Sequence, residues 1–336
     1  MRGIGWFLLC LTLIGINAAS SGEARLTRLF GDGYDFWDCD WSPGGFYLAL
    51  AGKEHQQPGE KSRIWLYVSG AEKPVLWTNT DAYCDDWPRW SPDGKYLALA
   101  RRELATRQTC IWWKDVATGA GQRLTEGPDD RQPSWSPDGQ SIVFRRGLGP
   151  QQSVLAIFSA ITGKTSVLPI KPGLVGEPCW GPDGAIYYTR YQALWQEIKS
   201  EGQTYLAQVI SGGRLWRYHL TTSEDKPLLN DTPERRMPAP SPDGKWLAFF
   251  GQRGNPGPVH SIPNPASWAL FLRNQATGKI TEVVTDVALT GGPPAWSRNS
   301  MTVTFYSLRQ TRPALWSCAL ADYSLVDAAP YEPDEF

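Results

Sequence analysis

Charged side chains precede five of six equivalent positions that recur along the chain, and the sixth is preceded by the uncharged segment Thr290-Gly-Gly-Pro-Pro. Seven of these side chains are acidic and three are basic, and in chain order they are Asp38, Asp40, Asp85, Asp86, Asp129, Asp130, Arg131, Glu177, Arg235 and Arg236. If the fold brings these segments together, their carboxylates and guanidinium groups can bind a polar protein segment, a sugar or a cation. Two carboxylates at a suitable distance can also hydrolyse a glycosidic bond, although nothing in the sequence selects a pair. The alternative interpretation is structural, because Asp in turns forms local hydrogen bonds.

Trp37, Trp195 and His260 complete the candidate site. Trp37 and Trp195 are aromatic positions that the pattern of the chain does not explain, so they either stack against a sugar or peptide or fill gaps between loops. His260 and His55 fall in predicted loops, but two histidines are too few for a metal site, which needs several converging ligands. The sequence has no Gly-x-Ser-x-Gly nucleophile motif, phosphate-binding loop or His-Glu-x-x-His motif. We therefore predict no catalytic residue, no metal and no cofactor.

The elements that position these residues follow from an internal repeat. A Trp-Ser-Pro-Asp-Gly segment, or a variant of it, begins near residues 41, 90, 135, 180, 240 and 296, at spacings of 49, 45, 45, 60 and 56 residues. Pro, Asp and Gly form a tight turn between apolar stretches, so each copy predicts a β-hairpin. A second hairpin follows each copy. Six units of four strands predict an all-β fold, a six-bladed β-propeller of four-stranded antiparallel blades.

Propeller topology places the segments that lead into the inner strands on one face, around the mouth of a central channel. The connections between second and third strands lie on the same face, and two of them, residues 191–213 and 251–267, are long enough to be binding loops or surface excursions. Residues 25–30 and 323–327 both resemble an outer strand, so either can close the last blade. We interpret five tryptophans at one equivalent position as packing between blades, namely Trp41, Trp90, Trp135, Trp180 and Trp296.

Composition and the first residues limit the class of protein. The 336 residues include 33 Lys and Arg against 34 Asp and Glu, for a formal net charge of −1, which argues against nucleic acid or an anionic membrane as the partner. Residues 1–22 combine Arg2, an apolar run over 6–16 and small residues, as in a secretory signal peptide; an uncleaved anchor is the alternative. The predicted organisation is a signal peptide over 1–22 and a propeller over 23–336, periplasmic or secreted, monomeric alone, with no stable membrane span after cleavage.

The cysteines exclude a disulfide scaffold. Five follow the signal segment, an odd number, and none forms a Cys-x-x-Cys pair, which removes the common zinc and redox spacings. Cys39 and Cys84 fall in adjacent segments on the same face of the predicted propeller. They are therefore the candidate disulfide.

The repeat resembles a known family. The unit that begins at Trp90, Trp-Ser-Pro-Asp-Gly-Lys-Tyr-Leu-Ala-Leu, followed by a strand and a Thr-Gly turn, is similar to the TolB-like (WD40-like) propeller repeat, and the resemblance covers residues 34–328. It implies a six-bladed propeller and, by analogy with TolB, a non-enzymatic envelope adaptor that binds a protein or peptide at the channel mouth. The chain departs from TolB because no α/β domain precedes its first repeat. The alternative is a lyase, a glycosidase or a sugar-binding propeller that takes a polysaccharide at the same mouth.

Overall fold

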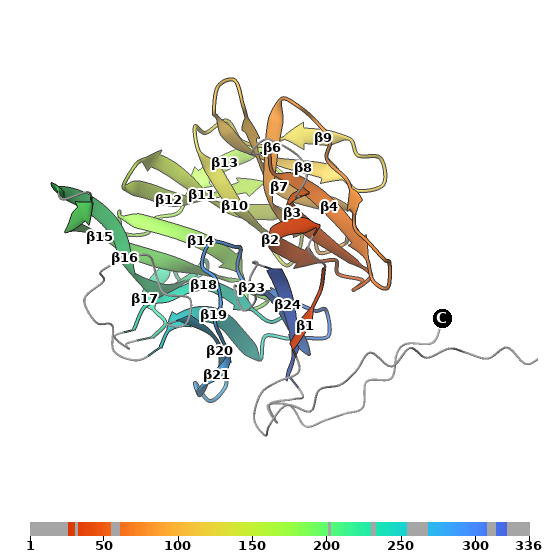
Figure 1. Cartoon of the computed structure of the whole chain (residues 1–336). Helices are drawn as coiled ribbons and strands as arrows, with labels where there is room; N and C mark the ends of the chain where they lie inside the picture. The colour runs from red at the N-terminus through yellow and green to blue at the C-terminus, as the bar shows by residue number, and fades with distance from the viewer. Residues whose placement is uncertain are drawn as a thin grey trace, which may run out of the picture.

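The computed structural model describes residues 26–30, 33–54, 61–200, 203–229, 233–253, 268–307 and 314–320. These residues form six four-stranded sheets that stand as blades around a central axis (Figure 1). The predicted all-β, six-bladed propeller is confirmed. The predicted signal peptide lies outside the described residues. Within the described ranges, no helix has the length and apolar character that a membrane crossing requires.

In blades one to five the chain fills each sheet in order, beginning with the strand that lines the axis. The strands of blades one to three are β2 (Tyr34–Trp41), β3 (Tyr47–Glu54), β4 (Arg63–Val68), β5 (Val75–Leu76), β6 (Tyr83–Trp90), β7 (Tyr96–Glu103), β8 (Thr109–Asp115), β9 (Gly121–Arg123), β10 (Asp130–Trp135), β11 (Ser141–Gly149), β12 (Gln152–Ser159) and β13 (Lys164–Val167). Those of blades four and five are β14 (Leu174–Trp180), β15 (Ala185–Ser200), β16 (Gln203–His219), β17 (Glu224–Pro227), β18 (Arg235–Pro240), β19 (Trp246–Gln252), β20 (Trp268–Asn274) and β21 (Ile280–Thr285).

The N-terminal strand closes the ring. Blade six consists of β22 (Ala295–Trp296), β23 (Thr302–Ser307), β24 (Ala314–Ala319) and, on its outer edge, β1 (Leu26–Arg28). Leu26 lies opposite Cys318 in this antiparallel pair and packs against the cluster between blades five and six. Of the two predicted closing segments, the structure thus uses the N-terminal one, whereas residues 323–327 lie outside the described residues.

We expect removal of β1 to destabilise the whole ring. A chain that begins after Arg28 leaves the edge of β24 open and uncovers the apolar surface under Leu26, so its free energy of unfolding should fall by at least about 2 kcal/mol. Urea unfolding followed by tryptophan fluorescence, with the chain that begins at residue 23 as the reference, measures the difference. Equal midpoints for the two chains would show that β1 does not hold the ring closed.

The repeated turn is stabilised by its own side chains. In blade two, the Ser91 hydroxyl donates to Asp93 Oδ1 at 2.6 Å and accepts the Tyr96 N–H at 2.9 Å. Gly94 has a φ of 71°, a backbone conformation that glycine adopts at no steric cost. Ser241 and Asp243 make the same contact in blade five. The Ser-Pro-Asp-Gly pattern therefore specifies this turn directly.

The repeated tryptophans connect neighbouring blades, as predicted. The indole N–H of Trp90 donates to the Asp40 carbonyl at 3.1 Å, and that of Trp135 donates to the Arg89 carbonyl at 3.0 Å. Trp296 donates in the same way to Ala239. Each of these bonds joins an inner strand to the one before it, so the large ring packs between blades while its polar atom is satisfied.

The long segment of blade four is not a loop. Residues 191–213 continue β15 and β16 as a two-stranded antiparallel arm, in register from Gln192 opposite Ser211 to Ser200 opposite Gln203. The arm extends beyond the blade (Figure 1). The prediction of a binding loop was wrong here, because the segment keeps hydrogen-bonding across the hairpin. In blade five, only residues 251–253 of the predicted loop 251–267 are described.

The predicted Cys39–Cys84 disulfide is not formed, and both residues are buried thiols. Cys39 packs with Ala295 and Leu315 of blade six, so its side chain faces away from blade two. Cys84 lies beside Arg102, whose guanidinium approaches its sulfur at 3.6 Å. The two cysteines also differ in their distance from the repeated tryptophan, two residues in one blade and six in the next, which places them at different depths along the axis.

Candidate functional site

The inner strands of all six blades enclose a central channel of about 510 Å³. Trp87, Gln132 and Glu177 line one end of it, which we call the mouth. The opposite end is formed by the repeated turns, with Arg298 among their prolines. Between the two ends the wall is mainly aromatic and proline-rich, and its tryptophans are Trp41, Trp87, Trp90, Trp135, Trp180 and Trp296.

A repeated backbone distortion shapes the mouth. Trp87, Gln132, Glu177 and Met237 have φ angles of 58°, 58°, 51° and 57°, in the left-handed region that residues with a Cβ rarely adopt. Each precedes a proline on an inner strand, at the point where the register of the strand pair shifts. Because such strain persists only where surrounding structure enforces it, four blades hold this bulge by packing.

Arg89 is the centre of a buried charged cluster in the channel wall. Its Nη1 lies 3.0 Å from Asp38 Oδ2, and the Asp38 side chain is 2% exposed. Asp40 Oδ2 accepts the Trp90 N–H at 2.7 Å. Burial raises the pKa of Asp38 to about 6 and that of Asp40 to about 7, against the lowering effect of Arg89 on both. These two predicted rim carboxylates therefore belong to one internal cluster.

Asp85 and Asp130 are structural ion pairs. Asp85 accepts two hydrogen bonds from Arg101, at 2.7 and 2.8 Å, and Asp130 accepts two from Arg146 at the same distances. Both carboxylates are fully buried. In each case the arginine is the cross-strand neighbour on the second strand of the same blade. A bidentate pair of this kind fixes the start of the inner strand and leaves the carboxylate unable to reach a ligand.

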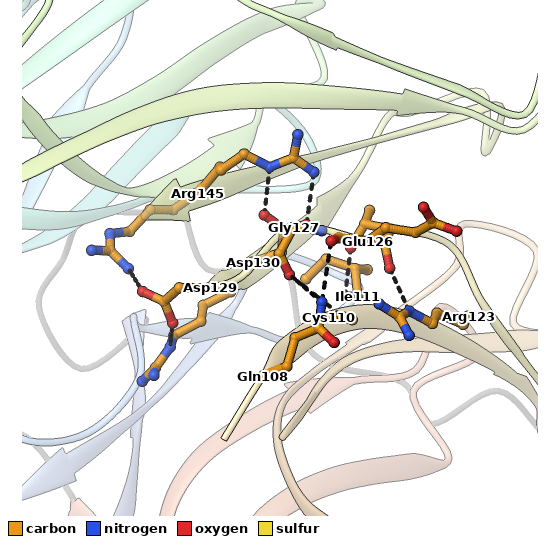
Figure 2. A network of polar contacts seen from close by, with 12 residues as sticks. Gln108, Cys110, Ile111, Arg123, Glu126, Gly127, Asp129, Asp130 and Arg145 are labelled. Atoms are coloured by element: carbon orange, nitrogen blue, oxygen red, sulfur yellow. Dashed lines mark hydrogen bonds and ion pairs between the residues drawn. The ribbon is translucent and has the colours of Figure 1, made fainter. Parts of the chain in front are cut away.

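Asp129 is half-buried beside this second pair. Arg131 and Arg145 both donate to it, the latter at 3.0 Å. Figure 2 shows Asp129 and Asp130 in one polar network that continues to Gly127, which receives hydrogen bonds from Gln108 and Cys110. The network joins blades two and three. Arg131, whose side chain is 45% exposed, is the member that solvent reaches most easily.

Trp37 and Asp86 connect blades one and two. The Trp37 indole donates to Asp86 Oδ1 at 3.2 Å, and the Ser62 hydroxyl donates to Oδ2 at 2.7 Å. Burial raises the pKa of Asp86, although the Ser62 bond acts in the opposite direction. Trp37 is therefore held at the blade boundary by its polar atom.

Glu177 is the centre of a second polar group at the mouth. Its backbone N–H donates to Gln132 Oε1 at 2.8 Å, and the Tyr191 hydroxyl donates to its Oε1. Arg236 stacks over the Tyr191 ring at 5.0 Å and pairs with Glu234 at 2.7 Å. The other carboxylate oxygen of Glu177, Oε2, is buried and has no hydrogen-bond partner among the described residues.

The remaining predicted residues lie apart from this group. Arg235 is buried, with its guanidinium over the Phe271 ring at 4.6 Å and a hydrogen bond to the Gln252 carbonyl. Trp195 belongs to the arm on β15, and its side chain lies outside what the structure describes. His260 and His55 also lie outside the described residues. In the parts of the chain that are described, no three His, Cys, Asp or Glu side chains form a group that can hold a metal ion.

Arg89, Tyr191 and the two arginines that pair with Asp85 and Asp130 were not predicted from the sequence. A signal for the pairs was present, because Asp85 and Arg101 recur as Asp130 and Arg146 at the 45-residue spacing of the repeat. Two opposite charges that recur together on adjacent strands indicate an ion pair. Arg89 and Tyr191 carry no such signal, since no other blade repeats them.

No protein-family model matches the chain, and no curated protein matches it. In structure it is similar to TolB from Acinetobacter baumannii, with a TM-score of 0.62 and 18% identity, over 82% of this chain and 64% of that one. The chain thus spans under two thirds of the length of that TolB. It is also similar to the oligogalacturonate lyase of Vibrio parahaemolyticus, with a TM-score of 0.54 and 13% identity, over 90% and 95% of the two chains. An oligogalacturonate lyase in complex with manganese matches at a TM-score of 0.52 and 13% identity, over 90% and 99%. At these identities the comparisons show a TolB-like propeller fold.

Proposed function

We propose that the chain is an exported, non-enzymatic propeller that binds an extended segment of a protein or peptide at the channel mouth. The observation that carries the proposal is Glu177, whose Oε2 is buried at the mouth without a partner among the described residues. A buried carboxylate oxygen without a hydrogen bond is costly, and an N–H donor of a ligand would satisfy it. An extended peptide offers such donors at regular spacing.

The shape and lining of the channel support a peptide segment. Its volume of about 510 Å³ falls in the range of roughly 300–1,000 Å³ that is typical of pockets for small ligands, so a few residues fit and a folded domain does not. Tryptophan-lined grooves recognise extended, proline-rich segments through flat apolar contacts. The proposal that the chain is exported rests on the pattern of residues 1–22. N-terminal sequencing of the secreted chain would support it if the mature chain begins near residue 23.

The rim carboxylates support binding over catalysis. Asp38, Asp85 and Asp130 are buried against arginines. Asp38 joins two blades and the other two fix strands within their own blades, so none of them has access to a substrate. The mouth residues that we propose for the partner are therefore Glu177, Gln132, Trp87, Arg131 and Arg236.

A sugar-active enzyme is the second candidate, favoured by the similarity to oligogalacturonate lyases. Asp40 lines the channel with a pKa raised to about 7 by burial, which suits a general acid. However, an oligogalacturonate is a polyanion, and the charged residues that line the channel are balanced: Asp40 and Glu177 against Arg89 and Arg298. Because Arg89 is already paired with Asp38, the lining offers little net attraction for such a substrate.

Selection of a random peptide library on the immobilised chain tests the proposal. We expect enriched peptides to bind the wild type and to bind Glu177→Gln about tenfold to a hundredfold more weakly, since a charge-assisted hydrogen bond is lost. The matched control is Glu224→Gln, an exposed carboxylate on the outer strand β17, which should bind as the wild type does. If no peptide is enriched and oligogalacturonate is instead cleaved to unsaturated products, the second candidate replaces the first.

A further inference from the structure

A second cleft, of about 350 Å³, lies between blades four and five. It is formed at the end of the blades that carries the repeated turns, with Asp183 from one turn and Gly244 from the next in its wall. Three basic side chains line it: Arg217 on β16, Lys226 on β17 and Arg273 on β20. The cleft meets the channel wall at Pro182 and Pro240 but none of the mouth residues belongs to it.

One row of blade four differs from the same row in the other blades. Tyr187, Arg217 and Lys226 are cross-strand neighbours on three adjacent strands. The equivalent rows elsewhere are apolar or uncharged, namely Ala49–Leu66–Val75, Ala98–Trp113–Gln122, Val143–Ile157–Ser166, Ala248–Leu272–Thr281 and Thr304–Ser317–Thr27. Packing between blades needs no charge at this row, because five blades pack without one. The basic pair of blade four therefore calls for another explanation.

The polar contacts in the cleft hold the basic groups in place. Arg217 Nη2 donates to Asp183 Oδ2 at 2.7 Å, and the Tyr187 hydroxyl donates to the same oxygen at 2.9 Å. Gln275 Nε2 donates to the Tyr187 hydroxyl at 3.3 Å, and its Oε1 accepts from Arg273 Nη1. Lys226 pairs with Glu224 at 3.0 Å, but both side chains are about half exposed, so this pair is weak and can rearrange.

Two donors remain without an acceptor. The Nε–H groups of Arg217 and Arg273 are buried and have no hydrogen-bond partner among the described residues. Of the charged groups in the wall, three are positive and only Asp183 is negative. A buried N–H on a charged group requires an acceptor, and a net positive wall favours an anion.

We propose that this cleft binds a phosphate dianion, either free or as the phosphate group of a larger molecule. The charge of the dianion, −2, balances the wall, where three basic groups face the single carboxylate of Asp183. The tetrahedral oxygens of phosphate can accept from Arg217, Arg273 and Lys226, which approach from different strands, whereas a planar carboxylate offers two oxygens in one plane. The site is independent of the peptide site at the mouth.

Isothermal titration of the chain from residue 23 with inorganic phosphate, at constant ionic strength, tests the proposal. We expect saturable binding at one site per chain, with sodium acetate and sodium chloride as comparison anions that do not compete. Arg273→Gln should weaken phosphate binding about tenfold to a hundredfold, and Lys226→Gln should weaken it to a smaller extent. Lys164→Gln, an exposed lysine on the outer strand of blade three, is the matched control and should leave binding unchanged.

The variants separate loss of binding from loss of folding. Lys226 is exposed and pairs only weakly, so Lys226→Gln should unfold at the wild-type midpoint while it binds phosphate less tightly. A sugar monophosphate titrated in parallel distinguishes the two sources: tighter binding than inorganic phosphate indicates a phosphate group on a larger molecule. The proposal is overturned if phosphate shows no saturable binding, if acetate competes equally, or if Arg273→Gln and Lys226→Gln both bind as the control does.

Discussion

Arg89→Ala is expected to lower the free energy of unfolding by about 3–5 kcal/mol at alkaline pH. Arg89 lies 3.0 Å from Asp38, which is 2% exposed, and Asp38 is otherwise held by the Cys39 N–H at 2.9 Å. Removal of the guanidinium leaves a carboxylate buried without its counter-charge. Loss of Arg89 therefore lowers stability far more than loss of one partner of a surface ion pair, because the desolvated charge of Asp38 remains in the fold.

Urea unfolding followed by tryptophan fluorescence measures this effect. The matched control is Arg131→Ala, which removes an arginine from an exposed pair with Asp129 and should cost no more than about 1 kcal/mol. The loss in Arg89→Ala should shrink as the pH falls toward about 6, because Asp38 without the lowering effect of Arg89 takes up its proton at a higher pH than the wild-type carboxyl, whose pKa is about 6, and the protonated acid needs no counter-charge. A loss equal to that of Arg131→Ala would show that Asp38 is not held by Arg89.

The fold was readable from the sequence because the repeated turn depends on local residues. Ser91, Asp93 and Gly94 make their contacts within one turn, so the same letters predict the same hairpin wherever they recur. The tryptophans at the start of units two, three and six likewise find their partners on the preceding inner strand. Six repetitions of a local rule are enough to specify a closed ring.

The candidate site was readable only in part, because its contacts join residues that lie far apart in the chain. The predicted acidic rim is largely internal: Asp38 binds an arginine of the next blade, and Asp85 binds one on the neighbouring strand. Composition cannot tell a carboxylate that faces solvent from one that faces a guanidinium. The Glu177 group depends on Tyr191 and Gln132, which come from two different blades and from no repeated motif.

The prediction of a loop at residues 191–213 of blade four was wrong for a different reason. Its length was read correctly as an insertion, but residues 191–200 and 203–211 contain no glycine or proline that would end the strands on either side. The register from Gln192 to Ser200 shows that the hairpin was extended and that no loop was added. Two stretches without glycine or proline, separated by only the two residues Glu201 and Gly202, were the signal for it.

Asp40→Asn is expected to change how stability depends on pH. Burial raises the pKa of Asp40 to about 7 in the folded chain, against the lowering effects of Arg89 and of the Trp90 N–H, whereas an Asp in the unfolded chain titrates near its ordinary value of about 4. The folded state therefore binds the proton more tightly. Between these two values the wild type loses stability as the pH rises, because ionisation of Asp40 is easier in the unfolded chain. Asparagine at this position does not titrate and can still accept the Trp90 N–H.

The stability of Asp40→Asn relative to the wild type should consequently rise with pH from about 4 to about 7, by up to roughly 1.4 kcal/mol for each pH unit. Asp40 is partly open to the channel, so we expect a total of about 2–4 kcal/mol. Unfolding midpoints in urea at a series of pH values measure the slope.

The matched control is Asp138→Asn, a turn carboxylate whose pKa the Ser136 hydroxyl lowers. The stability difference between this variant and the wild type should be flat over the same pH window. Because Asp38 and Arg89 are present in both the wild type and Asp40→Asn, the slope reports Asp40 together with its coupling to Asp38. Parallel pH profiles for the wild type and Asp40→Asn would mean that Asp40 is ionised throughout, held by Arg89 and solvent in the channel.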